Sequence, residues 1–216
     1  MMPATADKPA LIALIPAKAP HLGKQRLSAV PPAFRSAFAT AFALDTITAV
    51  RGCEAIDRAW LVCPDSALAT AAAKAGVPTI VDPIVPASDF NLMLRTVVDE
   101  LGLSPTGTAL VVPADLPAMT SEDLTVTIEL WDRATPGFVA DAPGTGTTLY
   151  VARSAEFDPH YGPGSKAAHL AAGAQELPVW LSSVTQDVDD IRDLDAAIGL
   201  GVGSHTRRVL ARLGLT

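Results

Sequence analysis

The sequence contains few cysteines, few aromatic residues and no long apolar run. Its two cysteines, Cys53 and Cys63, show neither CxxC spacing nor histidines at zinc-ligand spacing, so we expect reduced thiols without a disulfide or a zinc site. Aromatic residues make up 5% of the chain, which leaves little surface for stacking single-stranded bases. No apolar run approaches the roughly 18 residues of a membrane helix, and the N-terminal segment MMPATADKPA lacks the apolar core of a signal peptide. We therefore expect a cytoplasmic protein with no membrane partner.

Positive charge is also scarce. The chain has 16 Lys and Arg against 23 Asp and Glu, a net charge of −7, which argues against nucleic acid and anionic membranes as partners. An anionic substrate must therefore be met by local cations. The chain has neither a Walker P-loop nor a GxGxxG motif, which disfavours a kinase or a dehydrogenase.

The apolar content is nevertheless large enough for a full core. The chain has 216 residues, 49% of them hydrophobic, which predicts a single domain over residues 1–216 with an ordered core at about 11–213. Strand-like apolar runs lie at 11–15, 59–63, 78–81, 108–112, 138–140, 147–152 and 178–184. Helical patterns lie at 33–50, 65–75, 90–101, 121–131, 165–172, 190–199 and 204–213. This alternation predicts an α/β three-layer sandwich with a mostly parallel central sheet. The runs joined by DAPGTGT are too close for a crossover helix and form an antiparallel piece.

One of these runs ends in an acidic residue. In TALVVPADLPAMT, residues 108–112 are uncharged and rich in Val, as a strand buried on both faces requires, and Pro117 stops the ladder. Ligands of open α/β sheets bind outside the carboxyl ends of the strands. Asp115 is therefore placed to hold a metal ion or a sugar hydroxyl, and an ordinary turn aspartate is the alternative.

A second acidic group follows the run at 178–184. Asp187 and Asp189 have a spacing of two, which on an extended chain points both carboxylates to the same side. Carboxylates beside a substrate phosphate are the usual ligands of magnesium. Asp190 with Asp193 matches a capping box at the start of a helix, so we assign Asp190 to capping and its two acidic neighbours to chemistry.

The loop after the first strand carries cations. IPAKAPHLGKQRLS holds Lys18, Lys24 and Arg26 within nine residues, in the place where α/β folds usually meet nucleotide phosphates. Lys binds phosphate as a point charge and Arg through two hydrogen bonds, so the mixture suits a triphosphate. A solvated basic loop is the alternative.

Two further segments are candidates for anion binding. GTGTT at 144–148 could present consecutive backbone N–H groups, although a bare hairpin turn has the same sequence pattern. In FDPHYGPGSKAAHL, Gly162 and Ser165 lead into a helix whose N-terminus could bind phosphate. Ser165 could equally be an N-cap, and His169 is more often a packing or surface residue than a catalyst.

Taken in order, these segments resemble a known family. The order is K-x5-K-x-RL, FN at 90–91, VVPADLP, GTGT, FDPxxGPxS with a following His, and D-x-D before a Leu-rich C-terminal helix. It is similar, from about residue 11 to 213, to the CofC and FbiD family of guanylyltransferases. The members act on phosphoenolpyruvate or 2-phospho-L-lactate in coenzyme F-420 biosynthesis and are related in fold to MobA-like nucleotidyltransferases, of the nucleotide-diphospho-sugar transferase type.

The resemblance implies a role for each motif residue. It makes Asp115, Asp187 and Asp189 magnesium ligands, Thr147, Gly162 and Ser165 contacts to the phosphoenolpyruvate-type acceptor, and Lys18, Lys24, Arg26 and Asn91 contacts to GTP. Lys24, Arg26 and Asp115 would carry the catalysis. The chain departs from many relatives in having Thr148 after GTGT where they have Asn, and Asp89-Phe90-Asn91 where they have Gly-Leu-Asn. These departures leave the acceptor and the base open.

The implied reaction joins GMP from GTP to the acceptor's phosphate and releases pyrophosphate, with magnesium as cofactor. A downstream transferase is an expected partner, and the chain itself could be a monomer or a homodimer. Two alternatives stay open: a MobA-like enzyme with a molybdopterin or sugar phosphate acceptor, and a catalytically inactive nucleotide-binding module. The guanine preference follows from the resemblance alone.

Overall fold

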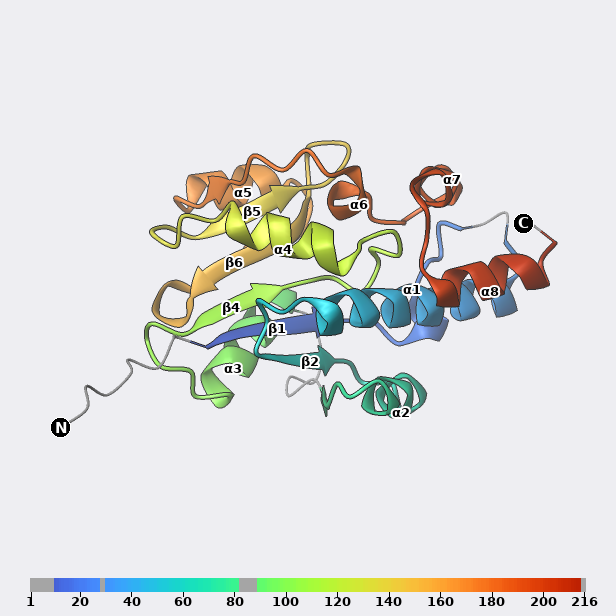
Figure 1. The fold of residues 1–216 in the computed structure, drawn as a ribbon, viewed down its shortest axis with the longest axis horizontal. Helices are drawn as coiled ribbons and strands as arrows, with labels where there is room; N and C mark the ends of the chain where they lie inside the picture. Colours follow the sequence, from blue (N-terminus) through green and yellow to red (C-terminus); the bar gives the residue numbers. More distant parts are fainter. Residues whose placement is uncertain (1–9, 28–29, 82–88, 215–216) are drawn as a thin grey trace.

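A computed structural model describes residues 10–27, 30–81 and 89–214. Within these residues the strands form one seven-stranded sheet in the order β3-β2-β1-β4-β6-β5-β7 (Figure 1). The strands are β1 (Leu11–Pro16), β2 (Arg58–Val62), β3 (Thr79–Ile80), β4 (Thr108–Val111), β5 (Gly137–Ala140), β6 (Thr147–Arg153) and β7 (Gln175–Glu176). Four of the six neighbouring pairs are parallel, so the predicted α/β fold with a mostly parallel sheet is confirmed.

The helices follow the predicted segments to within a few residues. The α-helices are α1 (Pro32–Gly52), α2 (Ser66–Lys74), α3 (Phe90–Glu100), α4 (Ser121–Glu129), α5 (Ser165–Ala171), α6 (Ser182–Thr185), α7 (Ile191–Leu200) and α8 (Ser204–Arg212), and the short 3-10 helices are η1 (Pro20–Leu22) and η2 (Ser154–Glu156). None of the helices in the described part of the chain has both the length and the apolar character to cross a bilayer.

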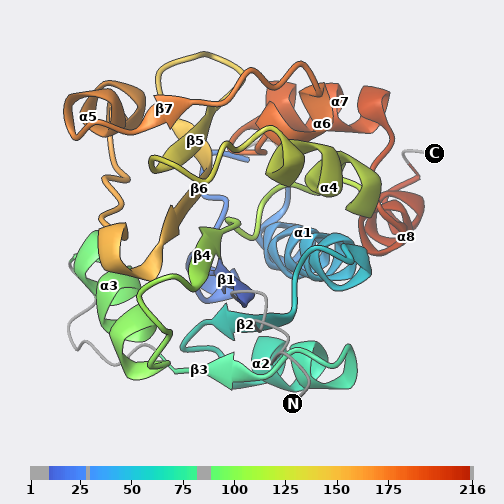
Figure 2. The ribbon, with the colours of Figure 1, turned by 60° about the vertical axis from the view of Figure 1, so that its left-hand side comes forward.

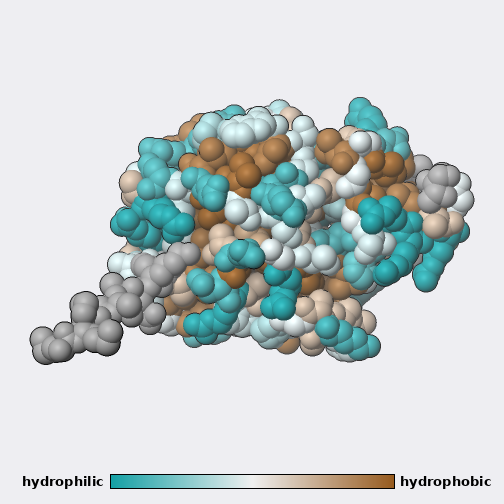
Figure 3. All heavy atoms as spheres, in the orientation of Figure 1, coloured by the Kyte–Doolittle hydropathy of each residue, from teal (hydrophilic) through white to brown (hydrophobic). Residues whose placement is uncertain are grey.

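The sheet is covered on both faces, because every residue of β1 is buried and successive side chains point to opposite sides. Leu11, Ala13 and Ile15 pack with the apolar residues of α1, α2 and α4. Ile12 and Leu14 pack with those of α3. Figure 2 shows the sheet between these two layers. On the face seen in Figure 3, hydrophobic atoms lie in separate patches between hydrophilic ones, as on an ordinary water-exposed surface.

The strand pairing brings several loops to one edge of the sheet. β1 and β4 are parallel neighbours, and β6 lies antiparallel on the other side of β4. The carboxyl ends of β1 and β4 and the amino end of β6 therefore meet at the same edge. The loop after β1, the turn after β4 and the residue Thr147 all lie there. The antiparallel β5–β6 hairpin was predicted, and it is confirmed.

The strand predicted at 178–184 is wrong. The last strand is Gln175–Glu176, and the segment Ser182–Thr185 is helix α6. The amide of Leu177 still donates to the carbonyl of Phe138 at 2.8 Å, but the next residue is Pro178, which has no N–H to continue the ladder. Beyond it Trp180 is 69% exposed, so the apolar run is not a buried strand.

The two cysteines lie in the core. Cys53 and Cys63 are both buried and free. Both pack in the cluster that joins α1 and α2 to the sheet. Their packing role is as expected, and their reduced state stays a prediction.

Candidate functional site

Three carboxylates converge at the loop edge of the sheet. The chain after β4 continues beside β1, because the amides of Val112 and Ala114 donate to the carbonyls of Leu14 (2.9 Å) and Pro16 (3.2 Å). Asp115 follows directly, at the carboxyl end of the strand as predicted.

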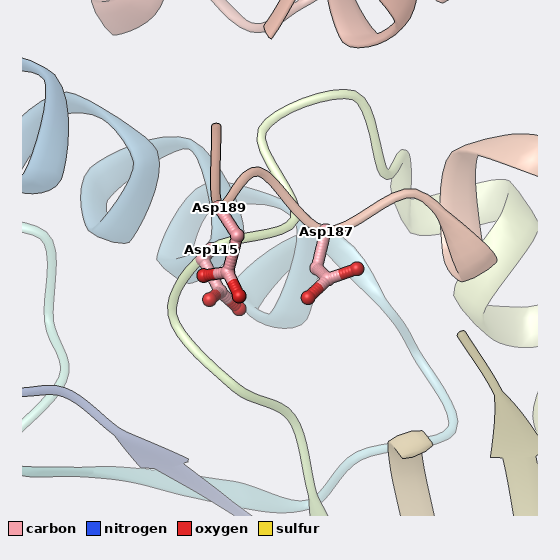
Figure 4. Close-up of side chains that lie close together, drawn as sticks. All are labelled: Asp115, Asp187 and Asp189. Atoms are coloured by element: carbon pink, nitrogen blue, oxygen red, sulfur yellow. The ribbon is translucent and has the colours of Figure 1, made fainter. Parts of the chain in front are cut away.

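The segment 187–189 is fastened across this turn. The amide of Val188 donates to the carbonyl of Asp115 at 3.1 Å, and the Val188 side chain is fully buried. Asp187 and Asp189 flank it and turn their carboxyl groups to the same side (Figure 4). One carboxylate oxygen from each of the three aspartates lies within 4.8 Å of the others. The structure thus brings together the three residues that the sequence assigned to one site.

The cluster is electrostatically unbalanced. Burial, followed by the charges of Asp115 and Asp189, raises the pKa of Asp187 to about 7 from an ordinary value of 3.8. A divalent cation would relieve this repulsion, and carboxylate oxygens are the ligands that magnesium prefers. The donor set of Asp115, Asp187 and Asp189 therefore fits the predicted metal, whose presence stays a prediction.

A lysine supplies part of the missing positive charge. The Lys24 ammonium lies 2.8 Å from Oδ2 of Asp115 and 3.5 Å from Oδ1 of Asp189. Burial opposes the charged form, but the charge and hydrogen bond of Asp115 and the charges of Asp189 and Asp187 outweigh it and raise the pKa of Lys24. The φ of Lys24 is 54°, in the left-handed region that favours glycine. Such strain is typical of residues held in place for function.

The other predicted cations lie at the surface. Arg26 is 80% exposed, and its Nη1 lies 3.6 Å from Oδ2 of Asp189. Lys18 is exposed in the loop after β1. Both side chains are therefore accessible to a triphosphate. Their contact with GTP stays a prediction.

The side chain of Asn91 is engaged within the protein. Its amide nitrogen donates to the carbonyl of Tyr161 at 2.9 Å, and its oxygen accepts from the Tyr161 amide at 2.7 Å. Asn91 thus joins the start of α3 to the loop before α5. In this arrangement its amide is used for the loop, and its contact with GTP stays a prediction.

The predicted acceptor residues form a second cluster beside the carboxylates. The hydroxyl of Ser165 donates to Oγ1 of Thr147 at 3.1 Å, and Nδ1 of His169 lies 3.0 Å from the same oxygen. Ser165 and His169 are buried, whereas Thr147 is partly exposed at the amino end of β6. Of the side chains of Ser165, His169 and Thr147, that of Thr147 is therefore the one that a ligand can reach.

Gly162 lies at the entrance to α5 with a φ of 140°, a conformation that side-chain-bearing residues rarely adopt. A Cβ added there would meet nothing within 4 Å. The backbone at Gly162 therefore faces open space, and its contact with an acceptor stays a prediction.

The turn GTGTT behaves as a hairpin connection. The amide of Thr145 donates to Oδ1 of Asp141 at 2.8 Å, and the amide of Gly144 donates to the Asp141 carbonyl at 2.9 Å. Asp141 thus satisfies these two N–H groups, and they are not free to bind an anion. This agrees with the hairpin alternative and not with an anion-binding nest.

The two capping interpretations have different outcomes. Asp190 is the N-cap of α7 and forms a capping box with Asp193, as predicted. The N-cap of α5 is Gly164, and no side-chain capping bond is present there. The alternative of Ser165 as an N-cap is wrong, because its hydroxyl donates to Thr147 instead.

The sequence of the chain matches one known family over nearly its whole length. The family model described as guanylyl transferase CofC like matches residues 11–216. The chain belongs to this family. A phosphoenolpyruvate guanylyltransferase of Streptomyces scabiei is 39% identical over 93% of this chain and 95% of its own length. The enzyme of the same name from Thermomonospora curvata is 34% identical over 93% of this chain and 88% of its own length. The resemblance predicted from the motifs is confirmed.

Solved structures share the fold at low sequence identity. A 4-diphosphocytidyl-2C-methyl-D-erythritol synthase superposes with a TM-score of 0.61 at 17% identity, covering 89% of this chain and 98% of its own. A cytidylyltransferase from Leptospira borgpetersenii superposes with a TM-score of 0.59 at 13% identity, covering 96% of each chain. The predicted nucleotidyltransferase type of α/β fold is thereby confirmed.

Sequence reasoning left His169 without a role. The residue is fully buried, with its ring stacked at centroid distances of 5.3 Å from Phe138 and 4.9 Å from Tyr150. Its Nε2 accepts the amide proton of His160 at 2.9 Å. The pattern that could have revealed it is the spacing of four from Ser165, which places both side chains on one helix face.

The buried imidazole gives the fold a pH dependence. Burial, with the charge of His160 next in importance, lowers the pKa of His169 from 6.5 to about 4. Between these values the unfolded chain binds a proton that the folded chain does not, so stability is lost as pH falls through this range. The shift corresponds to roughly 3 kcal/mol. We expect the urea-unfolding free energy to fall less steeply below pH 6.5 in His169→Gln, which retains the neighbouring His160 and Asp158. Equal slopes for both proteins would contradict the assignment.

Proposed function

We propose that this chain transfers GMP from GTP to the phosphate of phosphoenolpyruvate, or of a related three-carbon acid such as 2-phospho-L-lactate, with magnesium as cofactor. The proposal rests on one juxtaposition: the carboxylates of Asp115, Asp187 and Asp189, the partly buried ammonium of Lys24 and the hydroxyl of Thr147 all lie at one edge of the sheet. The relatives named phosphoenolpyruvate guanylyltransferase support the acceptor class. We further propose that the enzyme is cytoplasmic and that residues 1–216 form one domain.

The chemistry needs no nucleophile from the protein. An oxygen of the acceptor's phosphate attacks the α-phosphorus of GTP, the bond from that phosphorus to the bridging oxygen breaks, and pyrophosphate leaves with the bond's electrons. The protein's task is to hold two anions in line and to compensate their charge. Bound magnesium would supply Lewis-acid charge stabilisation at Asp115, Asp187 and Asp189.

Lys24 has two successive partners in this proposal. Without nucleotide its ammonium pairs with Asp115. When the nucleotide binds, its phosphates compete with Asp115 for the Lys24 ammonium, because an ammonium forms strong charge-assisted hydrogen bonds with phosphate and carboxylate oxygens alike. Arg26, which lies at the rim, would approach the phosphates from solvent.

Lys24→Ala should therefore weaken GTP binding by about 1 to 3 kcal/mol, the range for a charged hydrogen bond, and weaken acceptor binding less. Calorimetric titration with a GTP analogue that has a non-cleavable α–β bridge measures the first effect, and titration with phosphoenolpyruvate measures the second. Lys74→Ala, which removes an exposed lysine of α2, is the matched control. Equal losses for both ligands would place this loop outside the nucleotide site.

The proposed function is tested by pyrophosphate release. Purified protein, magnesium and GTP are incubated with phosphoenolpyruvate, 2-phospho-L-lactate or 3-phosphoglycerate, with ATP replacing GTP in parallel reactions. A downstream transferase is added in a second series to consume an unstable product. We expect release only with GTP and one of the first two acids. GTP binding without release in either series would indicate an inactive nucleotide-binding module, and release with molybdopterin or a sugar phosphate in place of these acids would indicate the other alternative.

A further inference from the structure

The hydrogen bonds around His169 fix where its proton lies. The backbone amide of His160 is a donor only, and it points to Nε2 of His169 at 2.9 Å. Nε2 must therefore be the unprotonated nitrogen. The ring is buried and its pKa is about 4, so the imidazole is neutral near pH 7 and its single N–H is on Nδ1. That N–H faces Oγ1 of Thr147 at 3.0 Å.

The oxygen of Thr147 consequently accepts twice. It receives the N–H of His169 and the O–H of Ser165 at 3.1 Å. A hydroxyl oxygen has two lone pairs and one proton. With both lone pairs occupied by buried donors, the proton of Thr147 is the one part of the group left to bond, and Thr147 is the one partly exposed residue of the three.

The surroundings hold this arrangement rigidly. The imidazole stacks with the rings of Phe138 and Tyr150, and the ring of Tyr161 packs at right angles to it at a centroid distance of 5.5 Å. The amide of Ser165 is also engaged, because it donates to the carbonyl of Gly162 at 3.0 Å. Both donors of Ser165 are thus engaged within the protein, which makes Ser165 a support for Thr147 rather than a free donor.

We propose that His169 is a positioning residue that, with Ser165, turns Thr147 into a dedicated hydrogen-bond donor aimed at an anionic oxygen of the acceptor. The inference rests on the proposed function for the identity of that acceptor. A threonine with a free rotor can present either a lone pair or a proton, whereas this threonine presents a proton, which suits a phosphate or carboxylate oxygen. His169 does not touch the acceptor and takes no proton in the reaction.

The proton arrangement can be observed without turnover. Imidazole nitrogen-15 NMR of the native chain, with His169 assigned by comparison with His169→Gln, should show a protonated Nδ1 and an unprotonated Nε2 from pH 6 to 8. A proton on Nε2, or an imidazolium in this range, would overturn the proposal whatever the enzyme's substrate.

Two variants of His169 separate its two hydrogen bonds. The amide of Asn reaches the position of Nδ1, so His169→Asn can still donate to Thr147, whereas the amide of Gln reaches the position of Nε2, so His169→Gln keeps only the acceptor for His160. We expect His169→Gln to raise the acceptor's KM roughly tenfold, as for loss of one hydrogen bond to a charged group, and His169→Asn to stay within about threefold. The KM for GTP should change in neither. Similar acceptor KM values for the two variants would mean that the histidine only fills space.

A double-mutant cycle with Thr147 completes the test. Thr147→Val, which keeps the shape but removes the hydroxyl, should raise the acceptor's KM by roughly ten- to a hundredfold, and Thr147→Ser should retain most of the affinity. In the Thr147→Val background, His169→Gln should add less than about twofold, because the proton it positions is gone. If the KM of the double variant rose by the product of the two single-variant effects, the proposal would be overturned.

Failure of the proposed function is distinguishable from failure of this inference. If the native chain releases no pyrophosphate with any of the three acids, the proposed function fails. In that case the affinity for phosphoenolpyruvate of the four proteins in the double-mutant cycle is measured by calorimetry. Binding that Thr147→Val leaves unchanged, or no binding by the native chain, contradicts the inference as well.

Discussion

Asp115→Asn should lower the rate of guanylyl transfer by roughly a hundred- to a thousandfold while the protein stays folded. The expected metal contributes several kcal/mol of charge stabilisation, and each 1.4 kcal/mol is about a factor of ten in rate. Asn keeps the size of Asp but removes the charge from a cluster whose ligand oxygens lie within 4.8 Å. The double variant of Asp187→Asn and Asp189→Asn should lose at least as much. Steady-state pyrophosphate release at several magnesium concentrations measures both.

The control for this prediction is Asp195→Asn, which removes an exposed carboxylate from α7 close in sequence to the cluster. It should have near-native activity and should need no more magnesium than the native chain. Near-native turnover by Asp115→Asn at ordinary magnesium concentrations, in a protein with an unchanged melting temperature, would contradict the metal assignment.

Gly162→Val should raise the acceptor's KM by roughly tenfold or more and leave the binding of GTP close to native. A Cβ at this position meets no atom within 4 Å, so the added side chain would extend into open space at the entrance to α5, where the acceptor is proposed to bind, instead of striking the protein. The φ of 140° also disfavours any residue other than glycine, at a cost on the order of 1 to 3 kcal/mol. Melting temperature and acceptor kinetics must therefore be measured on the same preparations.

Two variants separate bulk from strain at this position. Gly162→Ala imposes nearly the same backbone strain with far less bulk, and Gly173→Val places the same side chain at a positive φ of 88° beyond the other end of α5. Only Gly162→Val should impair acceptor saturation strongly. Unchanged saturation in a folded Gly162→Val protein would reduce the GPGS segment to a turn.

Much of the fold could be predicted because local patterns agree with the tertiary structure. The uncharged run before Asp115 has the composition of a buried central strand, and it is one, flanked by β1 and β6. Asp190 and Asp193 form a capping box, whose spacing before an apolar run marks the start of a helix. The segment 178–184 was predicted wrongly because its apolar composition is that of a strand, while Pro178 ends the ladder and Trp180 faces solvent.

The acidic site was predictable and the hydroxyl cluster was not. The position of Asp115 follows from a rule about strand ends, and the pair at 187 and 189 follows from alternation along an extended chain. In contrast, the proton of His169 depends on the His160 amide, and the inward direction of Ser165 depends on Thr147 on another element. Such contacts between distant segments leave no periodic trace in one sequence. The engagement of Asn91 with Tyr161 is of the same kind.

The central claim, that the acceptor's phosphate attacks the α-phosphorus of GTP, is tested most directly by following oxygen. The protein is incubated with magnesium, GTP and phosphoenolpyruvate carrying oxygen-18 in its phosphate, and the products are quenched or trapped at once and weighed by mass spectrometry. We expect a nucleotide product that contains both GMP and the acceptor and retains all the oxygen-18, together with unlabelled pyrophosphate. Orthophosphate as the released product, oxygen-18 in the pyrophosphate, or pyrophosphate release without incorporation of phosphoenolpyruvate would contradict it.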